Sequence, residues 1–263
     1  MGLIRVVEAW FDQNPKDLSG FDLVHYHQCP TPHAAPHCLD YYTMLVDLDR
    51  PPEDLLAGMR NGNPQQIRRA ITKDQVQCTF LRAPSHAERD AFQVFCQESN
   101  PGTLLDRNRL EVLAKAGMVA LSAALTPDGT PLVWHAYICP WGQRRVRCDL
   151  SASIQAGPDQ GDLRNLVGRA NRLLHYQDMV ALRTEGITCY DFGGWYPGTD
   201  DLKRLNINRF KEGFGGTVVR EYETEQPLTR LGELYQHLRF LKWRWVDRDL
   251  LKDFQRRRLV PEE

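Results

Sequence analysis

Several short segments of this chain are rich in apolar and β-branched residues and are bounded by turn-forming residues, which is the pattern of β-strands. Residues 126–130 read Thr-Pro-Asp-Gly-Thr, a hairpin turn, so the segments on either side should pair. The four histidines and four prolines of residues 1–40 indicate an irregular segment instead. Strands are predicted at 41–48, 76–81, 118–125, 131–139, 145–153, 187–192 and 217–222.

Other segments place apolar residues three and four positions apart, as on one face of a helix. Phe92, Phe95 and Cys96 form such a face, and Gly186 is a natural stop for the longest helix. The tail from residue 229 to 258 predicts one or two amphipathic helices. The remaining helices are expected just after Pro51 and at 65–71, 87–98, 107–116, 163–185 and 202–212.

The order of these elements from residue 87 onward is helix, helix, three meandering strands, long helix, strand, helix, strand. This order predicts a mixed α/β (α+β) fold, with a mostly antiparallel sheet, one parallel crossover and flanking helices. The phosphate-binding motifs G-x-G-x-x-G and G-x-x-x-x-G-K-[ST] do not occur, which argues against a doubly wound nucleotide fold. We expect an N-terminal extension at 1–85, a core at 86–225 and a helical tail at 226–263.

Charge, apolar content and cysteine usage indicate the cellular compartment. The formal charge of −1 demands neither DNA nor a membrane surface, and no apolar stretch is long enough to span a bilayer. The seven cysteines are scattered and form no C-x-x-C, which fits a reducing compartment. We therefore expect a soluble cytoplasmic protein without a DNA partner or a transmembrane segment.

Two segments near the end of the predicted core combine glycine, aromatic and charged residues. Residues 190–194 read Tyr-Asp-Phe-Gly-Gly, and residues 207–216 read Ile-Asn-Arg-Phe-Lys-Glu-Gly-Phe-Gly-Gly. Upstream, residues 66–70 read Gln-Ile-Arg-Arg-Ala after an acidic helix start. Together these segments resemble the Fem family of aminoacyl and peptidyl transferases, in a single-domain variant, over about residues 41–222. The resemblance implies a core of the GNAT acyltransferase type.

The resemblance also implies a site. In a GNAT core the acyl donor lies between two splayed strands, here 145–153 and 187–192. Glycines at 193 and 194 would let a ligand approach the backbone, with Trp195 beside them. Lys211 would meet a developing oxyanion, and Phe210 would pack beside the acyl group. The alternative is that these glycines only form turns and that Lys211 is a solvated cation.

Acyl transfer to an amine also requires a proton acceptor. The candidates are His135, His175 and Asp191, which ends a strand in the first motif; Asp191 is equally suited to ordering the turn that follows. Proton transfer through the substrate itself is a third possibility. Ser151 and Ser153, near a strand end, are candidates for binding substrate hydroxyls.

The start of the long helix is a further candidate binding site, because helix N-termini attract anions. It carries Arg169, Asn171, Arg172 and His175. Residues 164–170 have one residue too many for the Q/R-x-x-G-x-G/A loop of GNAT enzymes that use acyl-CoA. Fem-type transferases take an aminoacyl group from tRNA instead, so both donors stay open and no bound cofactor is expected. A solvated helix face is the competing interpretation for the two arginines.

His25 and His27 project to one side of an extended chain, which suggests a metal site. No carboxylate or cysteine in the neighbouring sequence completes a tight set, so no metal is expected, although Cys29 and Cys38 keep the alternative open. In the tail, basic residues alternate with tryptophans, as they do in segments that bind RNA or membranes.

The sequence therefore predicts an acyltransferase that forms an amide on an amine acceptor, such as an envelope, polysaccharide or natural-product amine. Charged tRNA is a candidate partner. The first alternative is an acyl-CoA-dependent GNAT N-acetyltransferase. The second is a non-catalytic GNAT-type protein that binds RNA or a protein partner.

Overall fold

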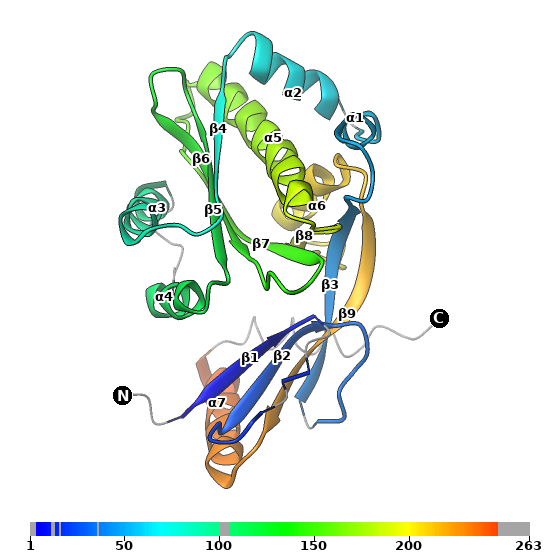
Figure 1. Ribbon diagram of the computed structural model, residues 1–263, viewed down its shortest axis with the longest axis vertical. Helices are drawn as coiled ribbons and strands as arrows, with labels where there is room; N and C mark the ends of the chain where they lie inside the picture. Colours follow the sequence, from blue (N-terminus) through cyan, green and yellow to red (C-terminus); the bar gives the residue numbers. More distant parts are fainter. Residues whose placement is uncertain are drawn as a thin grey trace. The chain divides into compact units, whose positions relative to one another are not determined.

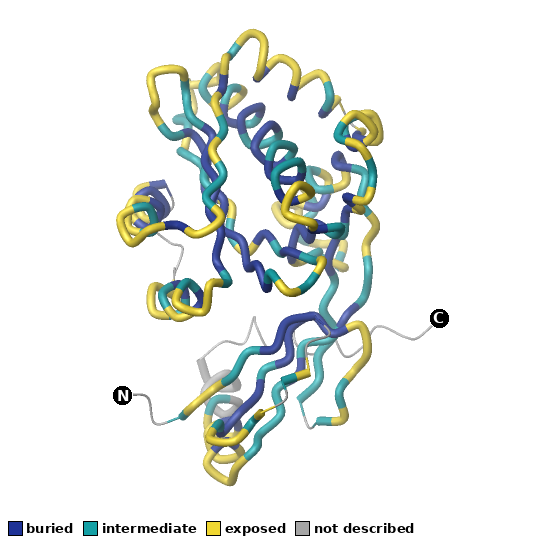
Figure 2. Tube along the Cα trace, in the orientation of Figure 1, coloured by how far each residue is buried: buried dark blue, intermediate teal, exposed yellow. Residues whose placement is uncertain are grey.

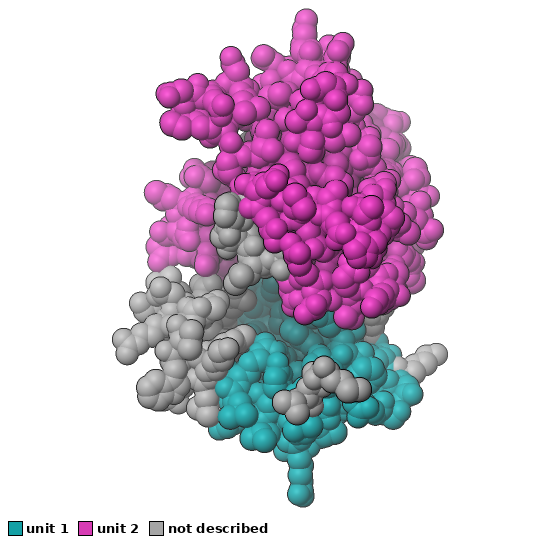
Figure 3. All heavy atoms as spheres, turned by 90° about the vertical axis from the view of Figure 1, so that its left-hand side faces the viewer, with its two compact units in different colours: residues 1–43, 218–263 teal, residues 44–217 magenta. Residues whose placement is uncertain are grey.

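The computed structural model describes residues 4–11, 14–15, 17–35, 37–60, 62–99 and 106–246, without the side chains of 240–246. The chain forms two compact units, which Figure 3 distinguishes by colour. We call residues 1–43 and 218–263 the terminal unit, and residues 44–217 the central unit. The expected divisions at 85 and 225 do not coincide with these units, because the segments around them pair with strands on the far side of each division.

The central unit is built on a mixed sheet with the strand order β3-β8-β7-β6-β5-β4. Strands β4 to β7 form an antiparallel meander, and β7 pairs with β8 in parallel. The predicted hairpin and the parallel crossover are therefore both present, and the predicted mixed α/β fold is confirmed. The strands are β3 (His37–Asp47), β4 (Gln77–Leu81), β5 (Val119–Leu125), β6 (Pro131–Ile138), β7 (Arg145–Ser153) and β8 (Cys189–Gly194).

Helices cover both faces of this sheet (Figure 1). The long helix α5 (Gly161–Thr184) packs against β4, β5 and β6, with α2 (Asn63–Thr72) beside it. On the opposite face lie α3 (His86–Ser99), which contacts β7, and α4 (Arg107–Lys115), which contacts β5. The remaining helices of the described central unit are α1 (Pro52–Ala57) and α6 (Leu202–Glu212).

Helix α5 owes its position to one apolar face. Ala170, Leu173, Leu174 and Met179 recur at helical spacing and are all buried, as Figure 2 shows along the side that meets the sheet. The helix ends where Gly186 takes a left-handed conformation with φ of 83°, as the sequence predicted. This face also carries the polar side chains of the candidate site.

The terminal unit has a second set of paired strands in the order β1-β2-β9-β3. It contains β1 (Val6–Trp10), β2 (Leu23–Cys29) and β9 (Thr217–Pro227), with β1 parallel to β2 and β2 antiparallel to β9. The prediction that residues 1–40 are irregular is wrong. The described prolines of this region, Pro15, Pro30 and Pro32, lie between the strands rather than inside them, so they do not interrupt the ladders.

The tail contains α7 (Arg230–Val246), which agrees with the predicted helix as far as residue 246. Residues 247–263, and the tryptophan-rich side chains from 240 onward, lie outside the described residues. Of the helices that the structure describes, none is both long and apolar enough to cross a membrane.

Candidate active site

A cavity of about 600 Å³ opens in the central unit where β7, β8, α5 and α6 meet. Its walls combine aromatic rings, a neutral amide and several charged side chains, as in ligand-binding clefts. It brings together most of the site residues that the sequence predicted. The lining residues are Arg147, Cys148, Asp149, Leu150 and Ser151 from β7, Asn171 and His175 from α5, Phe192, Gly193 and Gly194 from β8, and Lys203, Asn206, Ile207, Phe210 and Lys211 from α6.

The cavity exists because two neighbouring parallel strands part. β7 and β8 pair only from Arg145↔Cys189 to Arg147↔Asp191, although both strands continue beyond that point. On its other edge β7 has a bulge at Asp149, where the register against β6 shifts. A bulge bends and twists a strand, which moves this part of β7 away from β8. The splayed pair is the one that the sequence indicated.

Gly193 lies just beyond the last paired residues, where the backbone of β8 still passes close to β7. Its φ is 67°, and a Cβ at this position would lie 3.0 Å from the carbonyl oxygen of Cys148. Its N–H donates to Asp191 Oδ1 over 2.7 Å. A side chain at 193 would therefore meet both a strained backbone and a backbone oxygen.

Asp191 serves this turn rather than the cavity. It is fully buried, accepts from Gly193 N and forms an ion pair with Arg145 over 2.6 Å. It is not among the residues that line the cavity. Of the two roles considered for it, ordering the turn agrees better with this placement than proton transfer.

Lys211 places a cation at the cavity wall. Its ammonium donates to the carbonyl oxygens of Gly193 over 3.1 Å and of Gly194 over 2.6 Å. Burial lowers the pKa of Lys211 to about 8. An ammonium carries three protons, so these two carbonyls leave one N–H for a ligand in the cavity.

The second motif divides into a cavity part and a packing part. Phe210 lines the cavity, whereas Phe214 is buried in the core. Gly215 has a φ of 76°, and a Cβ there would lie 2.5 Å from the carbonyl oxygen of Gly58. The final glycines of the motif therefore let α6 end against the backbone that follows α1.

His175 lies on the cavity wall within a cage of aromatic rings. Its ring centroid is 4.9 Å from that of Phe192 and 5.7 Å from that of Phe210. Burial, with a smaller contribution from the nearby His135 and Lys211, lowers the pKa of His175 well below its ordinary value. The imidazole is therefore neutral at neutral pH.

The tautomer of His175 follows from a chain of hydrogen bonds behind it. Tyr137 donates its proton to Asp178 Oδ2 over 2.5 Å, so its oxygen accepts from the hydroxyl of Tyr190, 3.0 Å away. Tyr190 then has no further proton to give, and its oxygen accepts from Nδ1 of His175 over 2.6 Å. Burial raises the pKa of both tyrosines well above the ordinary value, so the phenols keep their protons. The Nε2 atom of His175 therefore carries a lone pair, as a general base requires.

His135 lies one layer behind the cavity. Its Nδ1 is 2.9 Å from Asp178 Oδ2, its Nε2 is 3.0 Å from Oδ1 of the cavity residue Asn171, and its side chain is fully buried. Ser122 also donates to Asp178 over 2.8 Å. His135 is therefore placed to position other groups rather than to touch a ligand.

Asp178 and Tyr137 were not predicted from the sequence, and Tyr190 was part of the first motif without a predicted role. A signal for Asp178 was present, because Asn171, His175 and Asp178 are spaced by four and three residues and so share one face of α5. That face is otherwise apolar, and three polar residues along an apolar stripe indicate a buried polar network. The two tyrosines occupy strand positions whose partners only the sheet register reveals.

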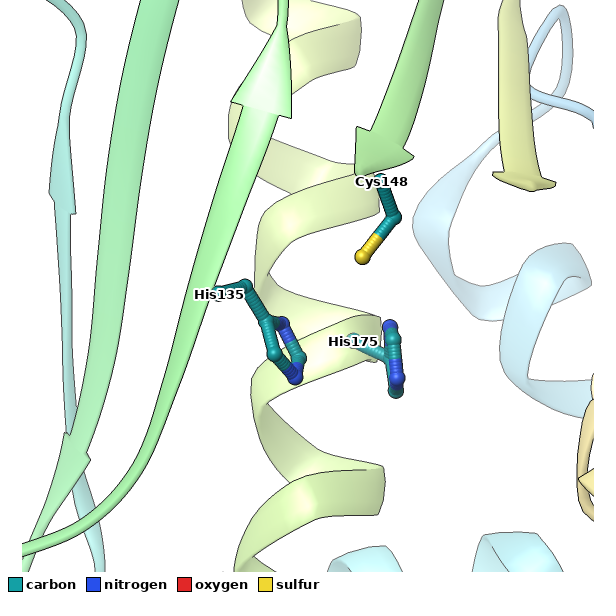
Figure 4. Close-up of side chains that lie close together, drawn as sticks. All are labelled: His135, Cys148 and His175. Atoms are coloured by element: carbon teal, nitrogen blue, oxygen red, sulfur yellow. The ribbon is translucent and has the colours of Figure 1, made fainter. Parts of the chain in front are cut away.

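Figure 4 shows the side chains of His135, Cys148 and His175 pointing into the space between strands β6 and β7 and helix α5. These residue types can hold a metal, but their donor atoms are engaged otherwise. Both nitrogens of His135 and Nδ1 of His175 have hydrogen-bond partners. Burial raises the pKa of the Cys148 thiol to about 12, so it is neither a ready thiolate ligand nor a nucleophile.

Four predicted binding residues lie away from the cavity wall. Arg169 forms a bidentate ion pair with Asp74 beside a second hollow of about 670 Å³ at the start of α5. Arg172 donates to Asn63 Oδ1 and to the carbonyl of Gly168. The other two are Ser153, beyond the lining part of β7, and Trp195, which packs against the core.

No protein-family model and no curated protein sequence matches this chain. Solved structures do match its fold. FemX superposes with a TM-score of 0.56 at 15% identity, covering 75% of this chain and 63% of FemX, so this chain spans less than two thirds of that neighbour's length. The C-terminal domain of a putative lysylphosphatidylglycerol synthetase from Agrobacterium fabrum gives a TM-score of 0.51 at 13% identity and covers 91% of this chain and 84% of that domain. The Fem-like fold that the motifs predicted is therefore confirmed.

Proposed function

We propose that this protein is an acyltransferase that moves an aminoacyl or acyl group onto an amine and forms an amide. The observation that carries the proposal is the opening between β7 and β8, which holds Lys211 as a hydrogen-bond donor and His175 as a neutral base. The fold shared with FemX supports the same class of reaction. Fold alone does not assign a substrate, so the argument rests on the cavity.

In the proposed reaction the acceptor amine attacks the carbonyl carbon of the donor, and a C–N bond forms. The amine proton passes to Nε2 of His175, and the chain through Tyr190 and Tyr137 to Asp178 stabilises the resulting imidazolium. The oxyanion accepts the third N–H of Lys211. The tetrahedral intermediate then collapses, the bond from carbon to the donor's leaving atom breaks, and that atom takes the proton from His175.

We further propose that the donor is an aminoacyl-tRNA. The arginines at the start of α5, which would hold the pyrophosphate of acyl-CoA, are engaged within the protein. Arg164 donates to the carbonyls of Gly157 and Pro158, and Arg169 pairs with Asp74. One fold neighbour is named for a lipid that carries a lysyl group, which favours an aminoacyl donor. A cytoplasmic location, where charged tRNA is found, belongs to this proposal, as does a small-molecule amine as acceptor.

The test compares radiolabelled aminoacyl-tRNA with radiolabelled acetyl-CoA, each incubated with the protein and a mixture of amino sugars, polyamines and amino acids. We expect label to move from charged tRNA to an amine, and charged tRNA to raise the melting temperature. Transfer from acetyl-CoA alone would replace the donor but keep the reaction class. Retention of uncharged RNA without transfer would favour the binding alternative, and inactivity with both donors together with unchanged melting temperatures would overturn the proposal.

A further inference from the structure

One face of the terminal unit carries polar side chains that the proposed reaction does not use. Across the paired strands, Glu8 lies beside His25 and Trp10 beside His27, and β9 adds Glu223 on the other side of β2. Nε2 of His25 is 3.1 Å from Glu223 Oε2, and Nδ1 of His27 is 2.8 Å from the same oxygen. The opposite face of these strands is apolar, with Ala9, Val24 and Tyr26 buried.

We propose that His25, His27 and Glu223 bind a divalent metal ion of the zinc class, which would join β2 to β9. One ligand atom from each of these residues lies within 4.8 Å of the others. Zinc takes imidazole and carboxylate ligands at about 2.0–2.2 Å, which in a tetrahedron separates neighbouring donor atoms by roughly 3.3 Å. The two separations that involve Glu223, 3.1 and 2.8 Å, are close to that value, and three ligands leave a fourth position for water or another ligand.

The hydrogen bonds of His27 favour a metal over a network of the protein alone. If Nδ1 donates its proton to Glu223, Nε2 of a neutral ring carries a lone pair. That Nε2 is buried without a hydrogen-bond partner among the described residues, and it faces the carboxylate of Glu8 at 3.8 Å. The lone pair of Nε2 and the carboxylate of Glu8, which are both hydrogen-bond acceptors, then face each other without a proton between them. A metal at Nδ1 moves the proton to Nε2, which becomes a donor to Glu8.

This second arrangement matches how proteins orient histidine ligands, since the other ring N–H of a metal-bound histidine usually donates to a carboxylate or carbonyl. Glu8 is already held for that role by a hydrogen bond of 3.2 Å from Trp10 Nε1. The indole of Trp10 also stacks on the His27 ring, with centroids 4.1 Å apart. The ring orientation is therefore set before any ion binds, and the outer carboxylate needs only a small approach from 3.8 Å to accept the N–H.

A bulge in β2 sits at the proposed site. The register against β9 shifts between Tyr26 and Cys29, and Gln28 has a φ of 53°. His27 and Gln28 thus share one partner position opposite Glu223. Bulges redirect side chains and are frequent beside functional sites, which explains an otherwise costly backbone conformation here.

The terminal unit would gain stability from such an ion. Its described core cluster holds four buried apolar residues, Ala9, Val24, Tyr26 and Cys29, and Trp10, Phe11 and Leu23 are also buried. Units with small cores are often stabilised by a structural metal, whose binding free energy adds to the stability of the folded state. This proposal is independent of the proposed acyl transfer.

The experiment uses the full chain, first treated with a chelator and then titrated with Zn²⁺ by calorimetry and with Co²⁺ by visible absorption. We expect binding of one equivalent of Zn²⁺, the intense absorption bands of tetrahedral Co²⁺, and a melting temperature that Zn²⁺ raises. Stoichiometric binding should be lost in His25→Gln and in Glu223→Gln. Glu8→Gln should retain the site with about 10- to 100-fold weaker binding, because it changes the outer carboxylate alone.

The matched control is His86→Gln, which removes an exposed histidine of the central unit and should bind Zn²⁺ as the unchanged protein does. Far-UV circular dichroism establishes that each variant is folded. The proposal is overturned if the unchanged protein takes up no stoichiometric Zn²⁺ or gives only octahedral Co²⁺ bands. It is also overturned if folded His25→Gln and Glu223→Gln bind as tightly as the control. The first two criteria hold even if a variant does not fold.

Discussion

The two units each contain a pair of histidine rings that lie close together at a tilt, and the pairs differ in what surrounds them. In the central unit the rings of His135 and His175 are 4.1 Å apart, and in the terminal unit those of His25 and His27 are 3.7 Å apart. The central pair is surrounded by hydroxyl, amide and carboxylate groups, and the hydroxyl of Tyr190 accounts for the proton position of His175. In the terminal pair, one carboxylate oxygen of Glu223 contacts a nitrogen of each ring. The buried Nε2 of His27 faces a second carboxylate, that of Glu8.

The groups that surround the two ring nitrogens of a histidine, and not its burial, therefore decide whether it suits proton transfer or metal binding. Phenol groups both donate and accept hydrogen bonds. The chain of hydrogen bonds from Asp178 to His175 therefore runs in one direction and leaves a nitrogen lone pair of His175 at the cavity. Carboxylates only accept, so two of them around one neutral imidazole require a cation or an extra proton. The two proposed roles follow this difference: proton transfer at His175 in the central pair, and metal binding at the terminal pair.

The strongest test of this assignment is His175→Gln. Because this change removes the proposed base but keeps a polar side chain at the cavity, we expect kcat/KM to fall on the order of a thousandfold. The measurement is the rate of label transfer from donor to amine. His86→Gln, which replaces an exposed histidine outside the cavity, should keep the rate of the unchanged protein. Equal rates in the two variants would mean that His175 is not the base.

The second test concerns the network behind the central pair. Asp178→Ala leaves Tyr137, Ser122 and His135 without their shared acceptor, so we expect a loss of about 3 kcal/mol or more in the free energy of unfolding. Urea denaturation measures it. The matched control is Asp90→Ala, because Asp90 pairs with His86 on an exposed helix face and should cost less than about 1 kcal/mol. Similar losses in both variants would contradict the buried network.

The third test asks whether Lys211 acts in the reaction or is only one of several polar groups in the cavity. Lys211→Ala should reduce turnover on the order of a hundredfold, because one donor to the oxyanion is lost. Arg209→Ala, which removes an exposed cation of the same helix, should have little effect. Melting temperatures show whether both proteins are folded. Unimpaired turnover in the folded Lys211 variant would remove Lys211 from the proposed site.

The pH dependence of kcat/KM tests the same Lys211 ammonium, with a smaller expected effect. Burial lowers the pKa of Lys211 to about 8, so its ammonium is present below this pH and is lost above it. If the ammonium is the active form, kcat/KM should fall as pH rises through about 8, by about tenfold at one unit above. Lys211→Arg should shift this fall to higher pH, since a guanidinium keeps its charge. A pH profile that rises through 8 would indicate that neutral Lys211 acts as a base.

The smallest effect is expected at the terminal pair without metal. His25 is the more exposed ring of the pair, and a glutamine amide can still donate to Glu223, so His25→Gln should cost about 1 kcal/mol or less in chelator-treated protein. In saturating Zn²⁺ the same variant should be clearly less stable than the unchanged protein. Thermal unfolding under both conditions measures the difference, and an equal cost in both would count against metal binding.

Much of the central unit follows from local patterns in the sequence. The hairpin turn at 126–130 predicted the pairing of β5 with β6, and Gly186 marked the end of α5, which lines the cavity. The two motifs also located Lys211, Phe210 and Gly193, which line it. These features depend on residues a few positions apart, so short-range patterns carry them.

The terminal unit shows where such patterns fail. Histidines and prolines obscured β1 and β2, and the missing carboxylate for His25 and His27 comes from Glu223, which lies 196 residues after His27. Nothing near the histidines in sequence indicated it. The role of Asp191 was likewise open until Arg145 and Gly193 were found on its two oxygens.

By itself, the amino-acid sequence determined the elements of the central unit and the motifs that border its cavity, because helix periodicity, turn chemistry and glycine conformations are local properties. Only the tertiary structure decided which polar groups meet. Strand register and helix packing bring together the hydrogen-bond chain from Asp178 to His175. They also place Glu223 against its two histidines. Those contacts join residues far apart in the chain, and the burial of apolar surface fixes them rather than any pattern near each residue.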